Sequence, residues 1–240
     1  GAQDEARELA ELLSLPVASS YTAKGVFPEN HPLALGCLGN GGRMYARQFF
    51  QDADLLLAVG TSFSEGTTLG FGNKTVPEGA KIIQIDTDPE QLGRNYPTEI
   101  AIQADAKVAL GAIIDGVKSR APKAAPTDRA EAIQQAKQTW KNDIDQTIGK
   151  QNLGYASVLR ALHDLLTGNE ILTTSGMTGD TLRNIDSKVP IIHAGEFRAI
   201  GTALATAFGV KIGRPEARVI CVTGDGSFMM EQQELATARY

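Results

Sequence analysis

The apolar positions of this chain follow two periods that alternate along the sequence. In residues 2–13, apolar side chains recur at helical spacing with acidic residues and Arg7 opposite them, which predicts an amphipathic helix. Runs of consecutive apolar residues predict strands that are buried on both faces. In the first half, strands are expected at residues 15–19, 54–59, 80–85 and 100–103, and further helices at 44–52 and 108–117. Helices that alternate with buried strands predict a parallel sheet covered on both faces.

A stretch with two prolines separates this series from a second one. Residues 118–127 hold Pro122 and Pro126 and almost no large apolar side chain, which is typical of a linker between domains. The polar helix predicted at 128–148 carries the only tryptophan, Trp140, and we expect its indole to be buried against the second domain. Beyond it, helices are predicted at 155–166, 178–185 and 199–210, and strands at 170–173, 190–193 and 218–223.

The two series predict an α/β protein with two doubly wound parallel-sheet domains. We place the first domain at residues 1–120, a linker and connecting helix at 121–152, and the second domain at 153–240. The chain starts on a helix with no preceding strand and stops within a helix-patterned segment, so we expect both domains to be incomplete at the chain ends.

Composition and charge narrow the classes of partner. Of the 240 residues, 42% are hydrophobic and 21% charged, as in an ordinary globular protein. The net charge of -5 and the scattered Lys and Arg residues offer no basic surface, so we expect no nucleic-acid partner. No apolar run approaches the roughly 20 residues of a membrane helix, and the amino terminus is no signal peptide, which predicts a cytoplasmic protein without membrane contact. Cys37 and Cys221 lack a partner motif and are expected to be reduced thiols.

The clearest candidate for a ligand-binding motif follows the last predicted strand, where the sequence reads Gly224-Asp225-Gly226-Ser227-Phe228. At the carboxyl end of a strand, two glycines let the backbone approach a ligand and one carboxylate can face a cation. Asp-Gly is also among the commonest turn dipeptides, so a plain strand-to-helix turn is the alternative interpretation.

Four segments together resemble the thiamine-diphosphate-dependent enzymes of the acetolactate synthase type. Residues 200–238 resemble part of the diphosphate-binding domain of that family, and residues 24–39, 53–60 and 83–89 resemble its central domain, in the family's order. Matched segments in the same order are more specific than any single motif. The resemblance covers nearly the whole chain, from about residue 6 onward, and residues 149–192 are its least distinctive part.

The resemblance implies roles for five residues. Asp225 would be a magnesium ligand, and the backbone at Gly224, Gly226 and Ser227 would hold the diphosphate. Hard oxygen ligands suit magnesium, and backbone amides at a helix start suit an anion, so the physical chemistry agrees with these roles. Ile200 would be the bulky apolar residue that props the cofactor into its bent shape. Without the resemblance, Ile200 would be interpreted as an ordinary core residue.

The family also implies a reaction. The intact protein is expected to use thiamine diphosphate and Mg²⁺ to decarboxylate a 2-oxo acid, or to join the resulting acyl carbanion to a second carbonyl, as a homodimer or homotetramer. This chain lacks the family's first domain, which supplies the glutamate that activates the cofactor, and we expect the chain alone to be inactive. The alternative is a noncatalytic adenine-nucleotide-binding or scaffolding module, which calorimetry with ADP, FAD and thiamine diphosphate would distinguish.

The central domain of the family resembles a Rossmann-like fold, and in some relatives it holds FAD or ADP. Here the loop at residues 60–66 lacks the arginine and paired aspartates of flavin-holding relatives, so we expect no bound flavin. Asp86 at a strand end could hold a ribose. We favour a helix start instead, with Asp88 as N-cap and Pro89 in the first turn. The run at residues 40–42, Asn-Gly-Gly, fits either a nucleotide-facing loop or a flexible turn.

The three histidines, His31, His163 and His193, show no metal-ligand spacing to one another, and a structural or solvated role is expected for each. His193 and Glu196 precede the small-residue helix and could line a substrate pocket, because ligands sit at the carboxyl ends of strands in such folds.

Overall fold

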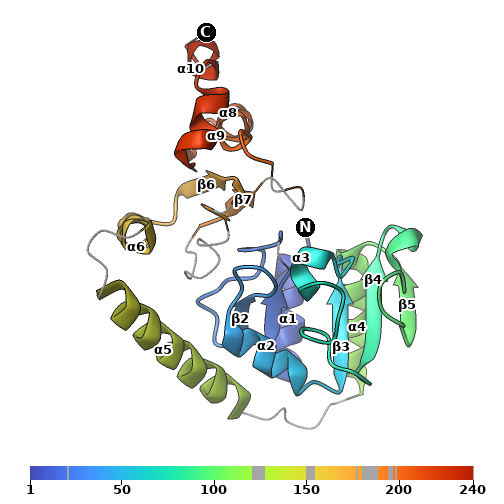
Figure 1. Ribbon diagram of the computed structural model, residues 1–240. Helices are drawn as coiled ribbons and strands as arrows, with labels where there is room; N and C mark the ends of the chain where they lie inside the picture. Colours follow the sequence, from blue (N-terminus) through green and yellow to red (C-terminus); the bar gives the residue numbers. More distant parts are fainter. Residues whose placement is uncertain are drawn as a thin grey trace.

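The computed structural model describes residues 1–20, 22–120, 128–149, 155–176, 178–179, 189–193, 197 and 199–239. It contains two α/β units with parallel strands, and the second lies above the first in the view of Figure 1. The α/β class and the parallel pairing predicted from the sequence are confirmed. None of the helices in the described ranges is long and apolar enough to cross a membrane.

The elements of the first unit are α1 (Gln3–Leu13), β1 (Val17–Ser19), β2 (Ala34–Cys37), α2 (Met44–Gln51), β3 (Leu55–Val59), α3 (Glu65–Thr68), β4 (Lys81–Asp86), the 3₁₀ helix η1 (Pro89–Gln91), β5 (Ile100–Gln103) and α4 (Ala106–Ser119). Strands β1 and β2 form one sheet, and β3, β4 and β5 form another in that order. β2 and α3 are absent from the sequence prediction. Lys118 and Ser119, predicted as linker, form the end of α4, and residues 121–127 lie outside the described part.

β3 shows why its apolar run is continuous. Leu57 and Val59 pack on one face against a cluster formed by α1 and α4, whose buried members are Leu9, Leu110 and Ile114. Leu56 and Ala58 alternate with them and pack on the opposite face with Phe63, Val76 and Ile82. Because successive side chains of a strand point to opposite faces, a strand covered on both faces needs apolar residues at every position.

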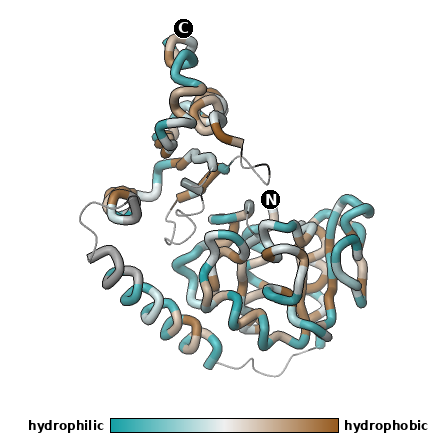
Figure 2. Tube along the Cα trace, viewed as in Figure 1, coloured by the Kyte–Doolittle hydropathy of each residue, from teal (hydrophilic) through white to brown (hydrophobic). Residues whose placement is uncertain are grey.

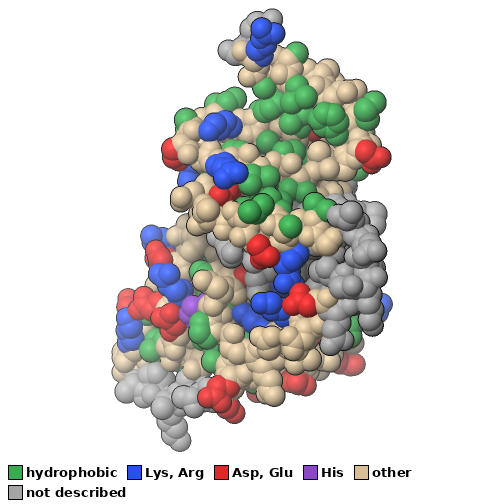
Figure 3. All heavy atoms as spheres, turned by 90° about the vertical axis from the view of Figure 1, so that its left-hand side faces the viewer, with side chains coloured by type: hydrophobic (Ala, Val, Ile, Leu, Met, Phe, Trp, Pro, Cys, Tyr) green, Lys and Arg blue, Asp and Glu red, His purple; other side chains and the backbone are tan. Residues whose placement is uncertain are grey.

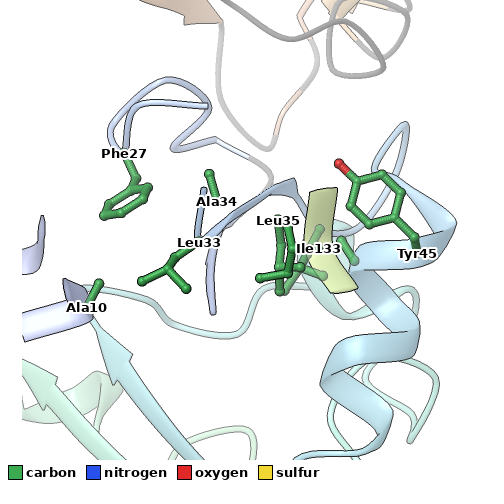
Figure 4. Packing of buried hydrophobic residues seen from close by; sticks show 9 residues of the cluster. Ala10, Phe27, Leu33, Ala34, Leu35, Tyr45 and Ile133 are labelled. Atoms are coloured by element: carbon green, nitrogen blue, oxygen red, sulfur yellow. The ribbon is translucent and has the colours of Figure 1, made fainter. Parts of the chain in front are cut away.

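Helix α5 (Asp128–Gly149) packs against the first unit. Ile133 is fully buried in a cluster with Leu35 of β2 and Tyr45 of α2, as Figure 4 shows. Trp140 packs against the same cluster, with its ring centroid 6.2 Å from that of Tyr45. The prediction that Trp140 is buried against the second domain is therefore wrong. Figure 2 shows hydrophobic and hydrophilic residues alternating along α5, and this alternation fixes which face is buried but not against which partner.

The second unit consists of α6 (Tyr155–Leu165), β6 (Glu170–Thr174), β7 (Ile191–His193), α8 (Ala203–Gly213), β8 (Arg218–Val222), α9 (Asp225–Glu231) and α10 (Glu234–Thr237). Its strands are parallel in the order β7, β6, β8. Leu162 of α6 packs on one face of the sheet with Leu172 and Ile220. On the other face, Thr173 donates a hydrogen bond to the Ala203 carbonyl of α8. Most of the helix predicted at 178–185 lies outside the described residues.

Helix α8 begins at Ala203, four residues later than the sequence predicts. Gly201 has a φ of 77°, in the left-handed region that ends or interrupts a helix, so residues 199–202 form a turn in place of the first helical turn. A Cβ at Gly201 would also lie 3.1 Å from the Met230 Cβ of α9. Both the backbone conformation and the close approach of α9 therefore require glycine at this position.

Many large apolar side chains of the second unit are exposed. They include Ile200, Ile212, Phe228, Met229, Met230 and Leu235. Figure 3 shows hydrophobic side chains gathered on the part of the surface nearest the carboxyl terminus.

Candidate functional site

The topology of the second unit defines where a ligand can bind. β7 follows β6 in the chain and pairs with one edge of β6, and the next strand, β8, pairs with the opposite edge of β6. The loops that leave the carboxyl ends of β6 and β8 diverge at such a switch point, and open α/β sheets bind ligands in the crevice between them. The register pairs Thr174 with Val222, so the residues that follow each strand leave the sheet side by side.

The Gly-Asp-Gly motif lies at this switch point. Gly224 is the N-cap of α9 and Asp225 is its first residue, with an exposed side chain. The first intrahelical bond runs from the Phe228 N–H to the Gly224 carbonyl, at 2.9 Å. The preceding N–H groups of the first turn lack intrahelical partners, as at every helix start, and such groups suit an anion.

Nothing within the described chain requires glycine at positions 224 and 226. Gly224 has φ -80° and ψ 164°, which any residue adopts, and Gly226 is not among the residues with positive φ. A Cβ added at either position would meet no atom within 4 Å. Neither the backbone conformation nor the packing of the described residues therefore needs glycine here, and the space beside both positions is open.

The Ser227 side chain points into the unit. Its exposed fraction is 7%, its Oγ lies 2.9 Å from the Ser175 Oγ after β6, and it accepts a 2.7 Å hydrogen bond from the Gly201 N–H. Because the Ser227 hydroxyl is bonded inside the unit, a ligand would contact the backbone of Ser227 and not its hydroxyl. The hydroxyl joins three segments of the site: the end of β6, the turn before α8, and the start of α9.

Ile200 lies in the turn before α8 with 59% of its surface exposed, so the interpretation as an ordinary core residue is wrong. Its Cγ2 lies 3.4 Å from the point where a Cβ on Gly176 would stand, which puts Ile200 beside the loop that follows β6. The structure thus brings Ile200, Ser227 and the Gly224–Asp225 turn to one edge of the sheet.

Two buried hydroxyls at this edge are absent from the sequence prediction. Thr174, the last residue of β6, is 1% exposed, and the Oγ1 atoms of Thr174 and Thr223 are buried with no hydrogen-bond partner among the described residues. An unsatisfied buried hydroxyl costs about 1–3 kcal/mol, so such atoms are rarely left without a partner. Threonine in a strand resembles an ordinary β-former, which is why sequence gives no signal for them.

His193 ends β7 at the same edge. Its Nε2 lies 3.5 Å from the Gly176 carbonyl oxygen, and a Cβ at Gly179 would collide with its ring. The ring therefore packs against the segment that follows β6. Glu196, its predicted companion in a substrate pocket, lies outside the described residues.

With this geometry in place, comparison with known proteins assigns the family. The model of the thiamine pyrophosphate enzyme central domain matches residues 1–113, and that of the C-terminal TPP binding domain of the same enzymes matches residues 173–240. The chain belongs to the thiamine pyrophosphate enzymes. The second match contains the switch point with Ile200, Asp225 and Ser227.

Curated proteins similar to this chain include acetolactate synthases. The chain is 34% identical to the probable acetolactate synthase large subunit of Methanocaldococcus jannaschii over 99% of its own length and 41% of the relative's. It is 32% identical to acetolactate synthase isozyme 3 large subunit of Escherichia coli K12, over 99% and 42%, and 30% identical to chloroplastic acetolactate synthase 1 of Nicotiana tabacum, over 98% and 36%. The chain thus spans about two fifths of the length of these relatives.

The residues at the switch point fit the cofactor of this thiamine pyrophosphate enzyme family. An exposed carboxylate, helix-start amides and two glycines with open space suit a diphosphate with a divalent cation. Among the described residues, no group of three or more His, Cys, Asp or Glu side chains could hold a metal ion. Asp225 can therefore supply only part of a metal's ligand shell here, and phosphate oxygens are the natural complement.

In the central domain of this thiamine pyrophosphate enzyme, the residues that were candidates for nucleotide binding make hydrogen bonds within the fold. The Asp88 carboxylate accepts the Glu90 N–H and caps η1, which confirms the capping prediction, although the helix is 3₁₀. Hydrogen bonds from the Gln91 side chain and then from the Glu90 backbone lower the pKa of Asp88. Asp86 Oδ1 accepts the Asp88 N–H at 3.0 Å. The Asn40 N–H likewise donates to the Gly66 carbonyl, so the start of the 40–42 run contacts α3.

A buried ion cluster in the same central region has no counterpart in the sequence prediction. Lys24 Nζ donates to both carboxylate oxygens of Glu29, at 2.6 and 2.8 Å, and the guanidinium of Arg43 lies 3.5 Å from the same carboxylate. All three residues are at most 6% exposed. Burial lowers the pKa of Lys24, and the charge of Glu29 opposes this shift. One carboxylate thus serves two buried cations.

Proposed function

We propose that the intact protein is a thiamine-diphosphate and Mg²⁺-dependent enzyme that decarboxylates a 2-oxo acid or joins its acyl group to a second carbonyl. The observation that carries the proposal is the pair Gly224 and Gly226, which stand at the switch point without a backbone or packing requirement. The relatives named above are acetolactate synthases, which supports the carboligase form of the reaction.

Each residue of the site has a defined part in this proposal. Asp225 binds Mg²⁺ through its exposed carboxylate, and the backbone at Gly224, Gly226 and Ser227 binds the diphosphate. Ile200 offers an exposed apolar side chain at the same edge, against which an organic ring can rest. When bound, thiamine diphosphate supplies the carbanion and electron sink for 2-oxo acid chemistry. The protein contributes binding and orientation.

The organisation of the chain is proposed along the same lines. Residues 1–120 form the central domain, 121–152 a linker and connecting helix, and 153–240 the part of the thiamine-diphosphate domain present here. The proposed protein is a cytoplasmic homodimer or homotetramer. The 240-residue chain alone, which spans about two fifths of its relatives' length, is proposed to give little turnover.

The test is an assay of the full-length protein with pyruvate and a panel of other 2-oxo acids, with and without thiamine diphosphate and Mg²⁺. Release of CO₂ with formation of a 2-hydroxy-2-methyl-3-oxo acid identifies a carboligase, and release of CO₂ with an aldehyde identifies a decarboxylase. Consumption of no 2-oxo acid in the presence of both cofactors would contradict the proposal. Binding of ADP with no effect of thiamine diphosphate would favour a noncatalytic nucleotide-binding module.

A further inference from the structure

Two side chains of α9 hold the start of α8. The Ser227 Oγ accepts the Gly201 N–H at 2.7 Å, and Glu231 Oε2 accepts the Leu204 N–H at 2.9 Å. Residues four apart lie on one face of a helix, so α9 presents both acceptors to the same neighbour. Each acceptor residue is 7% exposed. The N-cap residue of α8, Thr202, makes no side-chain cap bond, so Glu231 of α9 caps the first turn of α8 at Leu204 while Ser227 holds Gly201, the residue before the N-cap.

We propose that Ser227 and Glu231 are positioning residues that hold Ile200 in register with the Gly224–Asp225 turn. This inference rests on the proposed function. Ile200 directly precedes Gly201, whose N–H bonds to Ser227, and Asp225 stands two residues before Ser227 on the opposite side of the site. The two ligand-facing segments are therefore joined through one buried hydroxyl, and Glu231 repeats the connection one turn further along α9.

Two further contacts support this arrangement. The Ser227 Oγ also lies 2.9 Å from the Ser175 Oγ, which ties the same junction to the end of β6. Met230 packs so closely on Gly201 that a Cβ there would stand 3.1 Å from the Met230 Cβ. The start of α8 thus has little freedom while Ser227 and Glu231 hold it, and loses its fixed distance from Asp225 when they do not.

The inference predicts a selective effect on binding. Under the proposed function, thiamine diphosphate would be held both by the diphosphate site and by Ile200, whereas inorganic pyrophosphate would be held by the diphosphate site alone. Ser227→Ala removes the hydroxyl and keeps the backbone N–H proposed to bind phosphate. We expect Ser227→Ala and Glu231→Ala each to weaken the binding of thiamine diphosphate about tenfold, as the loss of a buried hydrogen bond implies. The binding of pyrophosphate should weaken by less than about threefold, because both substitutions keep the backbone N–H groups of the Gly224–Ser227 turn that are proposed to bind it.

The experiment is calorimetry of the full-length protein with Mg²⁺–thiamine diphosphate and with Mg²⁺–pyrophosphate. Glu231→Gln keeps an oxygen acceptor for the Leu204 N–H and should restore the wild-type ratio of the two dissociation constants. Lys211→Ala is the matched control, because Lys211 Nζ bonds to the Pro215 and Ala217 carbonyls at the far end of α8. Its loss weakens the same helix and should leave the ratio unchanged.

The possible results distinguish a failure of the positioning role from a failure of the proposed function. A changed ratio in Ser227→Ala and Glu231→Ala, together with recovery in Glu231→Gln, supports the positioning role. Equal weakening of both ligands, or an unchanged ratio in folded Ser227→Ala, overturns it. Ser227→Ala decides the matter by itself if Glu231→Ala does not fold. If the unmodified protein binds pyrophosphate but no thiamine diphosphate, the proposed function fails and this inference with it.

Discussion

Replacing Glu29 by Gln should strongly destabilise the first unit. The substitution keeps the shape of the side chain but leaves Lys24 and Arg43, at most 6% exposed, without their shared carboxylate. Removing one partner of a buried ion pair costs about 3–5 kcal/mol, because the charge that remains is still buried and has lost an opposite charge. A domain of this size is stable by about 5–15 kcal/mol in total, so the loss is a large share of it. Urea unfolding measures the change as a lower midpoint at an unchanged m value.

The geometry also ranks the variants. Lys24→Met should cost less than Glu29→Gln, because Glu29 keeps Arg43 at 3.5 Å when the lysine is gone. The double variant should lose less than the sum of the two single losses, since it leaves one buried cation fewer than Glu29→Gln alone. Glu99→Gln is the matched control: it breaks an exposed 3.7 Å pair with Lys81 and should cost under about 1 kcal/mol. A Glu29→Gln loss no larger than that of the control would refute the reasoning.

Three further predictions follow from the same structure. Ile133→Ala should destabilise the first unit by about 2–5 kcal/mol, as deletion of a fully buried isoleucine does, and urea unfolding with the fluorescence of Trp140 reports it. Burial of Glu170 opposes its ionisation, but hydrogen bonds from Thr167 and Gly168 outweigh burial and lower its pKa. The ionised carboxylate therefore stabilises the fold above its ordinary pKa of about 4.3, and this contribution is lost as the pH falls. Glu170→Gln should thus make the free energy of unfolding, followed by urea denaturation, less dependent on pH in the acid range. Gly226→Ala should change the free energy of unfolding by under about 1 kcal/mol while weakening thiamine diphosphate, which denaturation and calorimetry compare directly.

Much of the fold was predictable because local patterns carry it. β3 is a continuous apolar run, β4 and β5 are rich in isoleucine, and α1 has apolar residues on one face, so the hydrophobic pattern finds them. The sequence prediction missed β2 because this strand has only four residues and contains Gly36, which has a φ of 84° and is a residue type that weakens the strand pattern. Short elements with glycine depend on tertiary contacts that a sequence window does not contain.

Partners across the fold are the part that sequence could not supply. The amphipathic pattern of α5 predicts a buried face for Trp140, but the same pattern fits a contact with either unit. Nothing in the sequence marks Lys24 and Glu29 as a buried pair, because charged side chains are almost never fully buried unless paired. Ser227 and Glu231 did carry a signal, since polar residues four apart share a helix face. Their common partner, the start of α8, is set by the tertiary structure.

Calorimetry of the full-length protein with Asp225→Asn, titrated with thiamine diphosphate and Mg²⁺, tests whether this edge of the sheet is the cofactor site. Asp225 is the one side chain proposed to bind the cation, so the variant should lose most of the Mg²⁺-dependent affinity, at least about tenfold. Glu234→Gln on α10 is the control, because it removes a half-buried carboxylate further along the same segment that has no proposed role in the site, and it should leave the affinity unchanged. Equal dissociation constants for the wild type and Asp225→Asn at every Mg²⁺ concentration would contradict the assignment of this edge as the cofactor site.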